Sequence, residues 1–392
     1  MSDGNLLLVQ AGGPTQVLNE TLCAALEEAN CQDSNRKVFG SRRALQGMIR
    51  GDLVDLGFLT SAQIDQVRNS PGAALGSSRI KPTEEGLNSV VRNLRAHDIH
   101  QIVFIGGNGS MHAAHEIRTF AKRQNYDIQV VGAPKTIDND INGTDRCPGY
   151  ASAARYITQS TRDLGMDLRS LPQPVTILET MGRGVGWVAA ASSLAKRDPQ
   201  DAPHLVYIPE VPFDLDCFLS RLDAVLKAQG WAVVVVAEGI RDKQGKPVYE
   251  NTDPSMADAV KRPMVGGVAR FLAETAARGL GIRCRDEKPG LLGRASMLHV
   301  APQDRIDAAL VGREAVRALA RGDDEKMVAL MPLKNSEPAG FTMLPFEKVT
   351  GPERTIPREW TSDGPMPVNQ RFTEYLRPLV GELLEFEHVF ND

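Results

Sequence analysis

The chain alternates between short apolar segments and amphipathic segments, and this order constrains the fold more than any other feature. Apolar runs typical of buried β-strands cover residues 6–9, 101–105, 128–133, 176–179, 205–208, 232–237 and 326–331. Patterns typical of helices cover residues 15–30, 83–96, 111–124, 150–164, 265–279 and 302–321. Because strands that alternate with helices build a mainly parallel sheet covered by helices, we predict an α/β fold.

Length and composition narrow the class of protein. The chain has 392 residues, of which 42% are hydrophobic, and a net charge of −4. Such a length exceeds one compact core and suits two α/β lobes. The mild acidity gives no sign of nucleic-acid binding, and no apolar run reaches the roughly 20 residues that span a bilayer. We therefore expect no nucleic-acid and no membrane partner.

The cysteine pattern and the N-terminal residues are both typical of a cytoplasmic enzyme. Five cysteines, an odd number without C-x-x-C spacing, indicate reduced thiols rather than a disulfide framework or a zinc site. The first ten residues lack a basic segment followed by a long apolar stretch, so we expect no signal peptide. The expected location is the cytoplasm.

The residues directly after the strand at 128–133 carry the clearest chemical signal. This run, PKTIDND at residues 134–140, contains Lys135, Thr136, Asp138 and Asp140. Strands of α/β proteins deliver functional residues at their carboxyl ends. A lysine can neutralise phosphate oxygens, one aspartate can accept a hydroxyl proton, and the other can hold a magnesium shell. The pattern favours phosphoryl transfer, although an Asp-rich turn that caps the next helix would contain the same residues.

Two glycine-rich junctions add a second signal. The run GGNGS at residues 106–110 follows the strand at 101–105, and the run AGGPT at residues 11–15 follows the strand at 6–9. Each opens a predicted helix, so backbone amides and a helix N-terminus can meet an anion there. Neither run has the spacing of the dinucleotide fingerprint or of the P-loop. A tight turn that needs glycine dihedral angles remains the simpler alternative.

Six runs in order support a family resemblance. They lie at residues 12–13, 76–79, 106–110, 134–140, 181–183 and 237–239, within a stretch from about residue 5 to 335. With these motifs the chain resembles the phosphofructokinases of the bacterial ATP- and pyrophosphate-dependent superfamily, and the pyrophosphate branch most. The resemblance implies an Mg²⁺-dependent phosphotransferase that converts fructose 6-phosphate to fructose 1,6-bisphosphate.

The resemblance also implies two Rossmann-like lobes. The lobe that binds the phosphoryl donor is expected to hold residues 1–148 with a return near 294–344. The lobe that binds the sugar phosphate is expected to hold residues 149–293 with the tail 345–392. This tail is rich in proline and charge, so we expect it to wrap the surface and to carry no chemistry. Family members form dimers or tetramers, and a homodimer or homotetramer is expected.

Roles follow from the resemblance, residue by residue. Asp138 is the expected general base, Lys135 neutralises phosphate charge, Arg79 bridges the donor phosphates, and Asp140 orients the base or a metal-bound water. Asn108 stands where the family places its metal-positioning residue. The expected donor-binding residues are Gly12, Gly13, Arg79, Gly107, Gly109 and Ser110. The expected substrate-binding residues are Thr136, Ile137, Asp138, Met181, Gly182, Arg183, Glu238, Arg285 and Arg294.

Structural explanations stay open for three of these assignments. Arg79 could be a surface arginine after a small-residue turn, and residues 181–183 could be a glycine-rich helix start. Glu238 could simply end the strand at 232–237.

The identity of the donor is open because neighbouring positions disagree. Asn108 resembles a pyrophosphate-using branch, since ATP-using members usually carry aspartate there. Gly109 resembles ATP users, because pyrophosphate users usually carry an aspartate that fills the space of the nucleotide α-phosphate. Lys135 and the run at residues 288–294 resemble the pyrophosphate branch again. We favour pyrophosphate and keep ATP as the alternative.

The identity of the acceptor is also open. Pro174 stands where many members carry an arginine for the substrate phosphate, and Leu291 stands where a histidine or tyrosine is usual. Another sugar phosphate or an unphosphorylated polyol is therefore an alternative acceptor, and a non-catalytic regulatory subunit is an alternative of another class. A nucleotide-cofactor or lipid kinase would share only the glycine loop, and would leave the runs at 134–140 and 181–183 unexplained.

Overall fold

The computed structural model describes residues 4–78, 80–170, 174–250, 266–333 and 339–387. Within these residues the strands form a seven-stranded sheet in the order β11-β10-β5-β4-β1-β2-β3 and a four-stranded sheet in the order β7-β8-β6-β9. The strands are β1 Asn5–Gln10, β2 Val38–Ser41, β3 Leu53–Asp55, β4 Ile99–Gly106, β5 Gln129–Pro134, β6 Val175–Thr180, β7 Leu205–Tyr207, β8 Ala232–Ala237, β9 Cys284–Glu287, β10 Lys326–Leu330 and β11 Phe341–Pro345.

All strand pairs are parallel except those of the two edge strands of the larger sheet, β3 and β11. The predicted mainly parallel α/β fold is confirmed. The helices are α1 Leu18–Gln32, α2 Leu45–Arg50, α3 Ser61–Arg68, α4 Glu84–Ala96, α5 Asn108–Arg123, α6 Tyr150–Ser170, α7 Trp187–Ala191, α8 Leu215–Gln229, α9 Val268–Leu280, α10 Leu292–Ala295, α11 Pro302–Ala320, α12 Phe346–Val349 and α13 Gln370–Val380.

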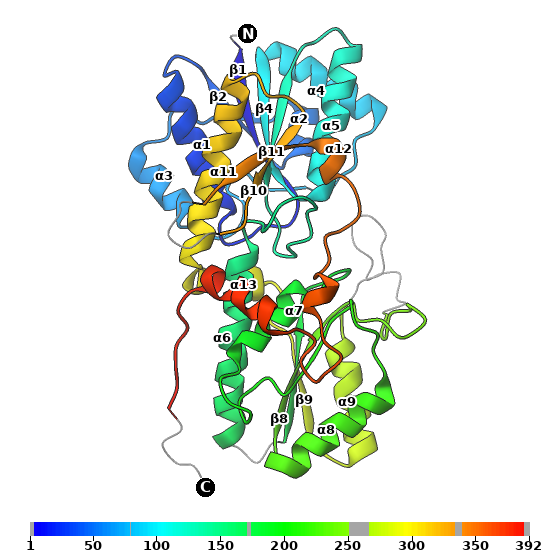
Figure 1. Cartoon of the computed structure of the whole chain (residues 1–392). Helices are drawn as coiled ribbons and strands as arrows, with labels where there is room; N and C mark the ends of the chain where they lie inside the picture. The colour runs from blue at the N-terminus through cyan, green and yellow to red at the C-terminus, as the bar shows by residue number, and fades with distance from the viewer. Residues whose placement is uncertain (1–3, 79, 171–173, 251–265, 334–338, 388–392) are drawn as a thin grey trace.

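Alternate residues of the central strands face opposite sides of the larger sheet. In β4, Ile102 and Phe104 pack in one core with residues of α4 and α5, whereas Val103 and Ile105 pack in another with residues of α1 and α11. Both faces are therefore covered, which explains why the strands are continuous apolar runs rather than alternating ones. Helix α11 lies along α1 in Figure 1, so a late segment of the chain covers the sheet that the first segment begins.

The two sheets form separate lobes that meet end to end (Figure 1). The segment after β5 leads into α6 of the second lobe, and β10 and β11 return to the first sheet. A buried ion pair joins the segment before α6 to α11. Arg146 donates from Nε and Nη2 to the carboxylate of Asp307, at 2.6 and 2.8 Å. No helix in the described part of the chain is both long enough and apolar enough to cross a membrane.

The tail after β11 differs from its expected surface course. Ile356, Phe372, Leu376 and Leu379 are all buried in the core around the smaller sheet. Helix α13 presents an apolar face to α6 and lies where the lobes meet (Figure 1). The expectation was wrong because the charged tail contains an amphipathic helix. Burial of its apolar positions contributes more free energy than its polar positions lose.

Candidate active site

The residues after β5 form a tight acidic loop, residues 136–140. The strand pairing continues as far as Lys135, whose amide donates to Gly106 O at 3.0 Å. The amide of Asp138 then donates to Thr136 Oγ1 at 3.0 Å, which turns the chain. Asn139 follows with a φ of 54°, a left-handed conformation that asparagine tolerates better than most residues. The acidic loop is therefore fixed by its own side chains at the carboxyl end of the sheet.

The carboxyl group of Asp138, the predicted general base, lies in an environment that favours its protonated form. Burial raises its pKa to about 7, and the neighbouring carboxylates of Asp140, Glu238 and Glu353 act in the same direction, against the opposing effect of Lys135. A carboxylate with a pKa near neutrality binds a proton far more readily than an ordinary aspartate. The acidic loop thus contains a carboxyl group whose pKa lies near neutrality.

Asn108 and Asp140 form a polar pair beside this base. The amide nitrogen of Asn108 donates to both the backbone oxygen and Oδ2 of Asp140, each at 3.3 Å. This orientation leaves Asn108 Oδ1 and Asp140 Oδ1 buried without a hydrogen-bond partner among the described residues. Burial also raises the pKa of Asp140. Two orphaned oxygens suit a hard divalent cation, which takes oxygen ligands and completes its shell with phosphate and water.

A set of three or more histidine, cysteine or acidic side chains with metal-binding geometry does not occur in the described ranges.

The glycine junctions converge on Lys135. Its Nζ donates to Gly13 O at 2.5 Å, and the Gly12 carbonyl accepts from Ser77 Oγ at 2.6 Å. Gly12 has a φ of 79°, and a Cβ added there would lie 3.2 Å from Lys135 Nζ and 3.8 Å from Ser110 Oγ. The buried Lys135 ammonium group and the Ser110 hydroxyl group thus lie beside the Gly12 turn, close to the N-terminus of α5, and a cation next to a helix N-terminus suits an anion.

The remaining donor-side predictions fall close to this space. Gly107 precedes α5 as its N-cap, so α5 begins three residues earlier than predicted and the glycine loop itself is the helix start. An added Cβ at Gly107 would lie 3.6 Å from Lys135 O. Gly109 is exposed, and an added Cβ there would meet no described atom within 4 Å. Arg79 lies outside the described residues.

The second lobe contributes a loop that we call the sugar loop, residues 181–186. It follows β6 and opens α7, and Gly182 has a φ of 140°. Glu238, at the end of β8, donates its amide to Thr180 O at 3.0 Å, and its Oε1 lies 4.0 Å from Arg183 Nε. Burial raises the pKa of the Glu238 carboxyl group. The structure therefore brings Met181, Arg183 and Glu238 to the carboxyl ends of two adjacent strands.

A pocket of about 270 Å³ joins the acidic loop to the sugar loop. Its lining residues come from both lobes: Ile137, Ala153, Ile157, Glu179, Thr180, Met181, Val188, Pro289, Gly290 and Gly293. Arg294 follows the last of these in α10. Arg285, by contrast, is exposed in β9 opposite Thr176, so the structure does not bring it to this pocket.

Sequence reasoning missed several residues of the site. Glu179 is buried at the end of β6, accepts from the amides of Gly267 and Ala269 at the start of α9, and pairs with Lys288 Nζ at 2.7 Å. An acidic residue inside an otherwise apolar strand was an available signal for it. The tail residue Glu353, which lies against Gly184, had no comparable signal, because only the tertiary fold brings it there.

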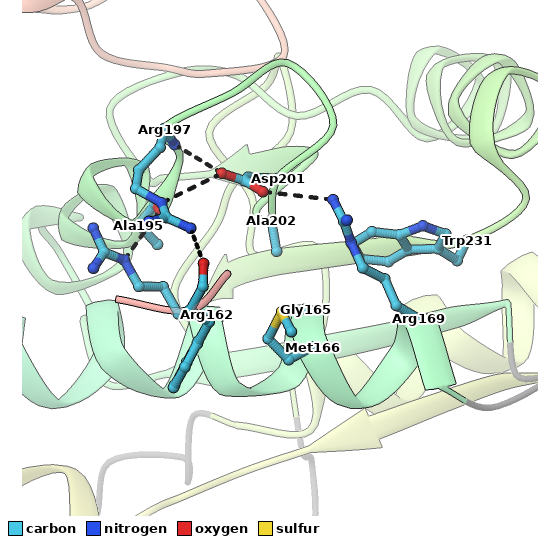
Figure 2. A pocket seen from close by; sticks show the side chains of 10 residues that line it. Arg162, Gly165, Met166, Arg169, Ala195, Arg197, Asp201, Ala202 and Trp231 are labelled. Atoms are coloured by element: carbon cyan, nitrogen blue, oxygen red, sulfur yellow. Dashed lines mark hydrogen bonds and ion pairs between the residues drawn. The ribbon is translucent and has the colours of Figure 1, made fainter. Parts of the chain in front are cut away.

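A second pocket, of about 300 Å³, lies beside the C-terminal half of α6 in the second lobe (Figure 2). It is lined by Arg162, Gly165, Met166, Arg169, Ala195, Arg197, Asp201, Ala202, Trp231 and Phe386. Arg162 Nη1 donates to Leu384 O at 2.9 Å and Arg197 Nη2 to Phe386 O at 2.7 Å. The guanidinium groups of Arg162 and Arg197 therefore hold the end of the tail by hydrogen bonds. None of the predicted site residues line this pocket.

Comparison with known proteins agrees with this geometry. A model of the family described as Phosphofructokinase matches residues 5–319. The chain is 34% identical, over 97% of its length and 92% of the relative's, to pyrophosphate--fructose 6-phosphate 1-phosphotransferase of Xanthomonas campestris pv. campestris (strain B100). It is 31% identical, over 95% and 94%, to sulfofructose kinase of Alkalicoccus urumqiensis. The solved pyrophosphate-dependent phosphofructokinase of Marinobacter aquaeolei superimposes with a TM-score of 0.86 at 29% identity, covering 98% of this chain and 94% of that one.

Proposed function

Because the chain belongs to the phosphofructokinase family, we propose that it transfers a phosphoryl group from pyrophosphate to the 1-hydroxyl group of fructose 6-phosphate. The products are fructose 1,6-bisphosphate and phosphate, and the reaction is reversible. One observation carries this proposal: the acidic loop lies between the anion site around Lys135 and the pocket lined by Ile137 and Met181. A donor phosphate and an acceptor hydroxyl group could meet at Asp138.

The chain's own residues divide the chemistry. Asp138 accepts the proton of the 1-hydroxyl group as the sugar oxygen attacks phosphorus and the bond to the leaving phosphate breaks. Lys135 and the amides near Gly13 neutralise the developing charge on the phosphate oxygens. Mg²⁺ is the proposed cation; held by Asn108 and Asp140, it would neutralise the charge of the donor phosphates.

In this proposal the second lobe binds the sugar phosphate. Arg183 and Arg294 would bind the acceptor's phosphate, and Glu238 would accept a hydrogen bond from a sugar hydroxyl group. Arg79 would bridge the donor phosphates. We assign donor binding to residues 1–148 with a return near 294–344 and acceptor binding to the rest. We also propose a homodimer or homotetramer in the cytoplasm, where the five free cysteines remain reduced.

The choice of pyrophosphate over ATP depends on two neighbouring residues. Asn108 presents a neutral oxygen to a cation, as expected for the pyrophosphate branch. Gly109 leaves open space, which an adenosine donor could use. ATP is therefore the second candidate donor, and pyrophosphate is favoured because several relatives that match nearly the whole chain carry pyrophosphate in their names.

The test compares two donors and two variants. Fructose 1,6-bisphosphate formation is measured with fructose 6-phosphate and Mg²⁺, with pyrophosphate and ATP in parallel. We expect turnover with pyrophosphate, and a fall in kcat of about 10²- to 10⁴-fold in Asp138→Asn. The matched control is Asp127→Asn, an aspartate whose side chain is 85% exposed. Wild-type turnover by Asp138→Asn would remove this residue from the mechanism, and turnover with ATP alone would reverse the choice of donor.

A second acceptor, sulfofructose, has specific support. The similarity to sulfofructose kinase spans 95% of the chain. Two positions where the family usually binds the acceptor's phosphate hold Pro174 and Leu291, and Leu291 is 63% exposed rather than pointing into a polar site. The two acceptors are compared by kcat/KM with each donor. A higher value for sulfofructose would replace fructose 6-phosphate as the substrate while leaving Asp138 in its role.

A further inference from the structure

Residues 353–356 of the tail lie between the acidic loop of the first lobe and the sugar loop of the second. We call this segment the clasp. It belongs to the part of the chain for which the sequence predicted no chemistry, yet its backbone and side chains contact both loops of the candidate site. Hydrogen bonds from the clasp reach residues of both lobes.

On the first lobe the clasp holds the acidic loop through Arg354. Its amide donates to Asp140 O at 2.8 Å, and its Nη1 donates to Asn139 O at 3.3 Å. Asn139 is held in its left-handed conformation from the other side, because its Nδ2 donates to the Tyr375 hydroxyl at 3.0 Å and its Oδ1 accepts from Cys147 N at 2.9 Å. The tail therefore supplies contacts on two sides of the residue between the two aspartates.

On the second lobe the clasp meets the start of α7. The indole Nε1 of Trp187 donates to Arg354 O at 3.0 Å, and the guanidinium carbon of Arg354 lies 4.3 Å from the centroid of the Trp187 ring. Trp187 is fully buried and directly follows the sugar loop. Glu210 Oε1 accepts from both Gly186 N, at 3.0 Å, and Ile356 N, at 3.3 Å. One carboxylate oxygen thus joins the clasp to the sugar loop.

A glycine, Gly184, lies where the clasp crosses this loop. A Cβ added at Gly184 would overlap the carboxylate of Glu353. The absence of a side chain at residue 184 lets the Glu353 carboxylate lie directly against the sugar loop.

We propose that Arg354 is a positioning residue that holds the acidic loop in register with the sugar loop, so that Asp138 faces the acceptor hydroxyl group. This inference rests on the proposed function, because it concerns the same transfer reaction. The guanidinium group suits the task, since one planar cation can donate to the Asn139 carbonyl and stack on the Trp187 ring at once. A misplacement of about 1 Å at a reacting centre can cost about 100-fold in rate.

The experiment uses the full chain with three single substitutions. Arg354→Ala removes the guanidinium contacts but keeps the backbone bond to Asp140, and Arg354→Lys keeps the charge without the planar group. Arg358→Ala is the matched control, an exposed arginine four residues along the same tail. We expect Arg354→Ala to lower kcat by tenfold or more with KM for pyrophosphate changed less than threefold, and Arg354→Lys to restore only part of the loss.

Hydrogen exchange provides a readout that does not depend on turnover. We expect Arg354→Ala to speed amide exchange in residues 136–140 and 181–187, with the strands of both sheets unchanged. Exchange and kcat both equal to those of Arg358→Ala would overturn the role of Arg354. A uniform rise in exchange over the whole lobe would also overturn it, because that result indicates general destabilisation. If the wild type is inactive with every donor and acceptor tested, the proposed function fails, and the exchange comparison still decides whether the clasp orders both loops.

Discussion

Replacement of Asp307 by asparagine should destabilise the protein by about 3 kcal/mol, near the lower end of the range for a broken buried pair. Asp307 and Arg146 each have side chains only 2% exposed, and they are joined by two hydrogen bonds at 2.6 and 2.8 Å. The asparagine leaves the Arg146 cation without its bidentate counter-charge. Breaking such a pair generally costs about 3–5 kcal/mol, because the remaining charge stays buried.

Two remaining contacts place the expected value at the lower end of this range. Arg146 Nη1 still donates to Met331 O at 2.7 Å and to Asp145 Oδ2 at 3.3 Å. The second contact retains a carboxylate near the guanidinium group. Burial raises the pKa of Asp145, so this carboxylate is itself costly to ionise and compensates only in part.

The assay is urea unfolding followed by tryptophan fluorescence and far-ultraviolet circular dichroism. Glu274→Gln is the control, because it breaks an exposed pair with Arg270, whose side chains are 75% and 52% exposed, and should change stability by less than about 0.5 kcal/mol. The double variant Arg146→Met/Asp307→Leu should be more stable than Asp307→Asn, since it removes both members of the most buried pair and leaves only the partly exposed Asp145 carboxyl group, which can take up a proton. An Asp307→Asn variant as stable as Glu274→Gln, or a double variant less stable than the single one, would refute the reasoning.

Three further outcomes test other parts of the structure. Gly109→Asp should lower kcat/KM for any ATP use more than for pyrophosphate use, because it fills space next to the anion site; equal losses in donor kinetics would contradict this. His204 Nδ1 accepts a hydrogen bond from the Val233 amide, and burial lowers the pKa of His204 from 6.5 to about 4. As the pH drops from 6.5 to 4, the unfolded state therefore binds a proton that the folded state does not, and the free energy of unfolding should fall by up to about 3 kcal/mol. His204→Gln should flatten that dependence in unfolding measured against pH, and an unchanged slope would exclude His204 as its source. Gly312→Ala should lower the thermal midpoint by the equivalent of about 1–3 kcal/mol, because its Cβ would overlap Thr21 O between α11 and α1; a normal midpoint would show that these helices can separate freely.

The sequence predicted those parts of the fold that depend on local pattern. Thr83 marks the start of α4 in the sequence, and in the structure its hydroxyl group accepts from Gly86 N at 3.1 Å. The convergence of Lys135 with the loop at Gly12 and Gly13 was also predictable, because the carboxyl ends of the parallel strands in one sheet lie at the same edge, and only β4 separates β5 from β1. These features each depend on a few consecutive residues and on a general rule of parallel sheets.

The parts that the sequence did not predict depend on contacts between distant segments. Arg354 contacts residues more than 160 positions away along the chain, and nothing in the run around it indicates which loop it meets. The position of Arg285 could not be predicted for a related reason: β9 pairs with β6 in a register that places it opposite Thr176, and register follows from the whole sheet. A family pattern gives the order of motifs, but packing decides which side chains reach the site.

The electrostatics of the acidic loop explain why an asparagine suits position 108. Asp138, Asp140 and Glu353 already place several carboxylates near one another, and their mutual repulsion together with burial raises the pKa of Asp138. An aspartate at position 108 would add another negative charge and could not donate to Asp140, as the Asn108 amide does twice. The amide therefore satisfies Asp140 while keeping one neutral oxygen for a cation. We expect such a site to bind a bare cation weakly and a cation that carries its own phosphate ligands better, which is the physical reason to propose a small, highly charged donor at this position.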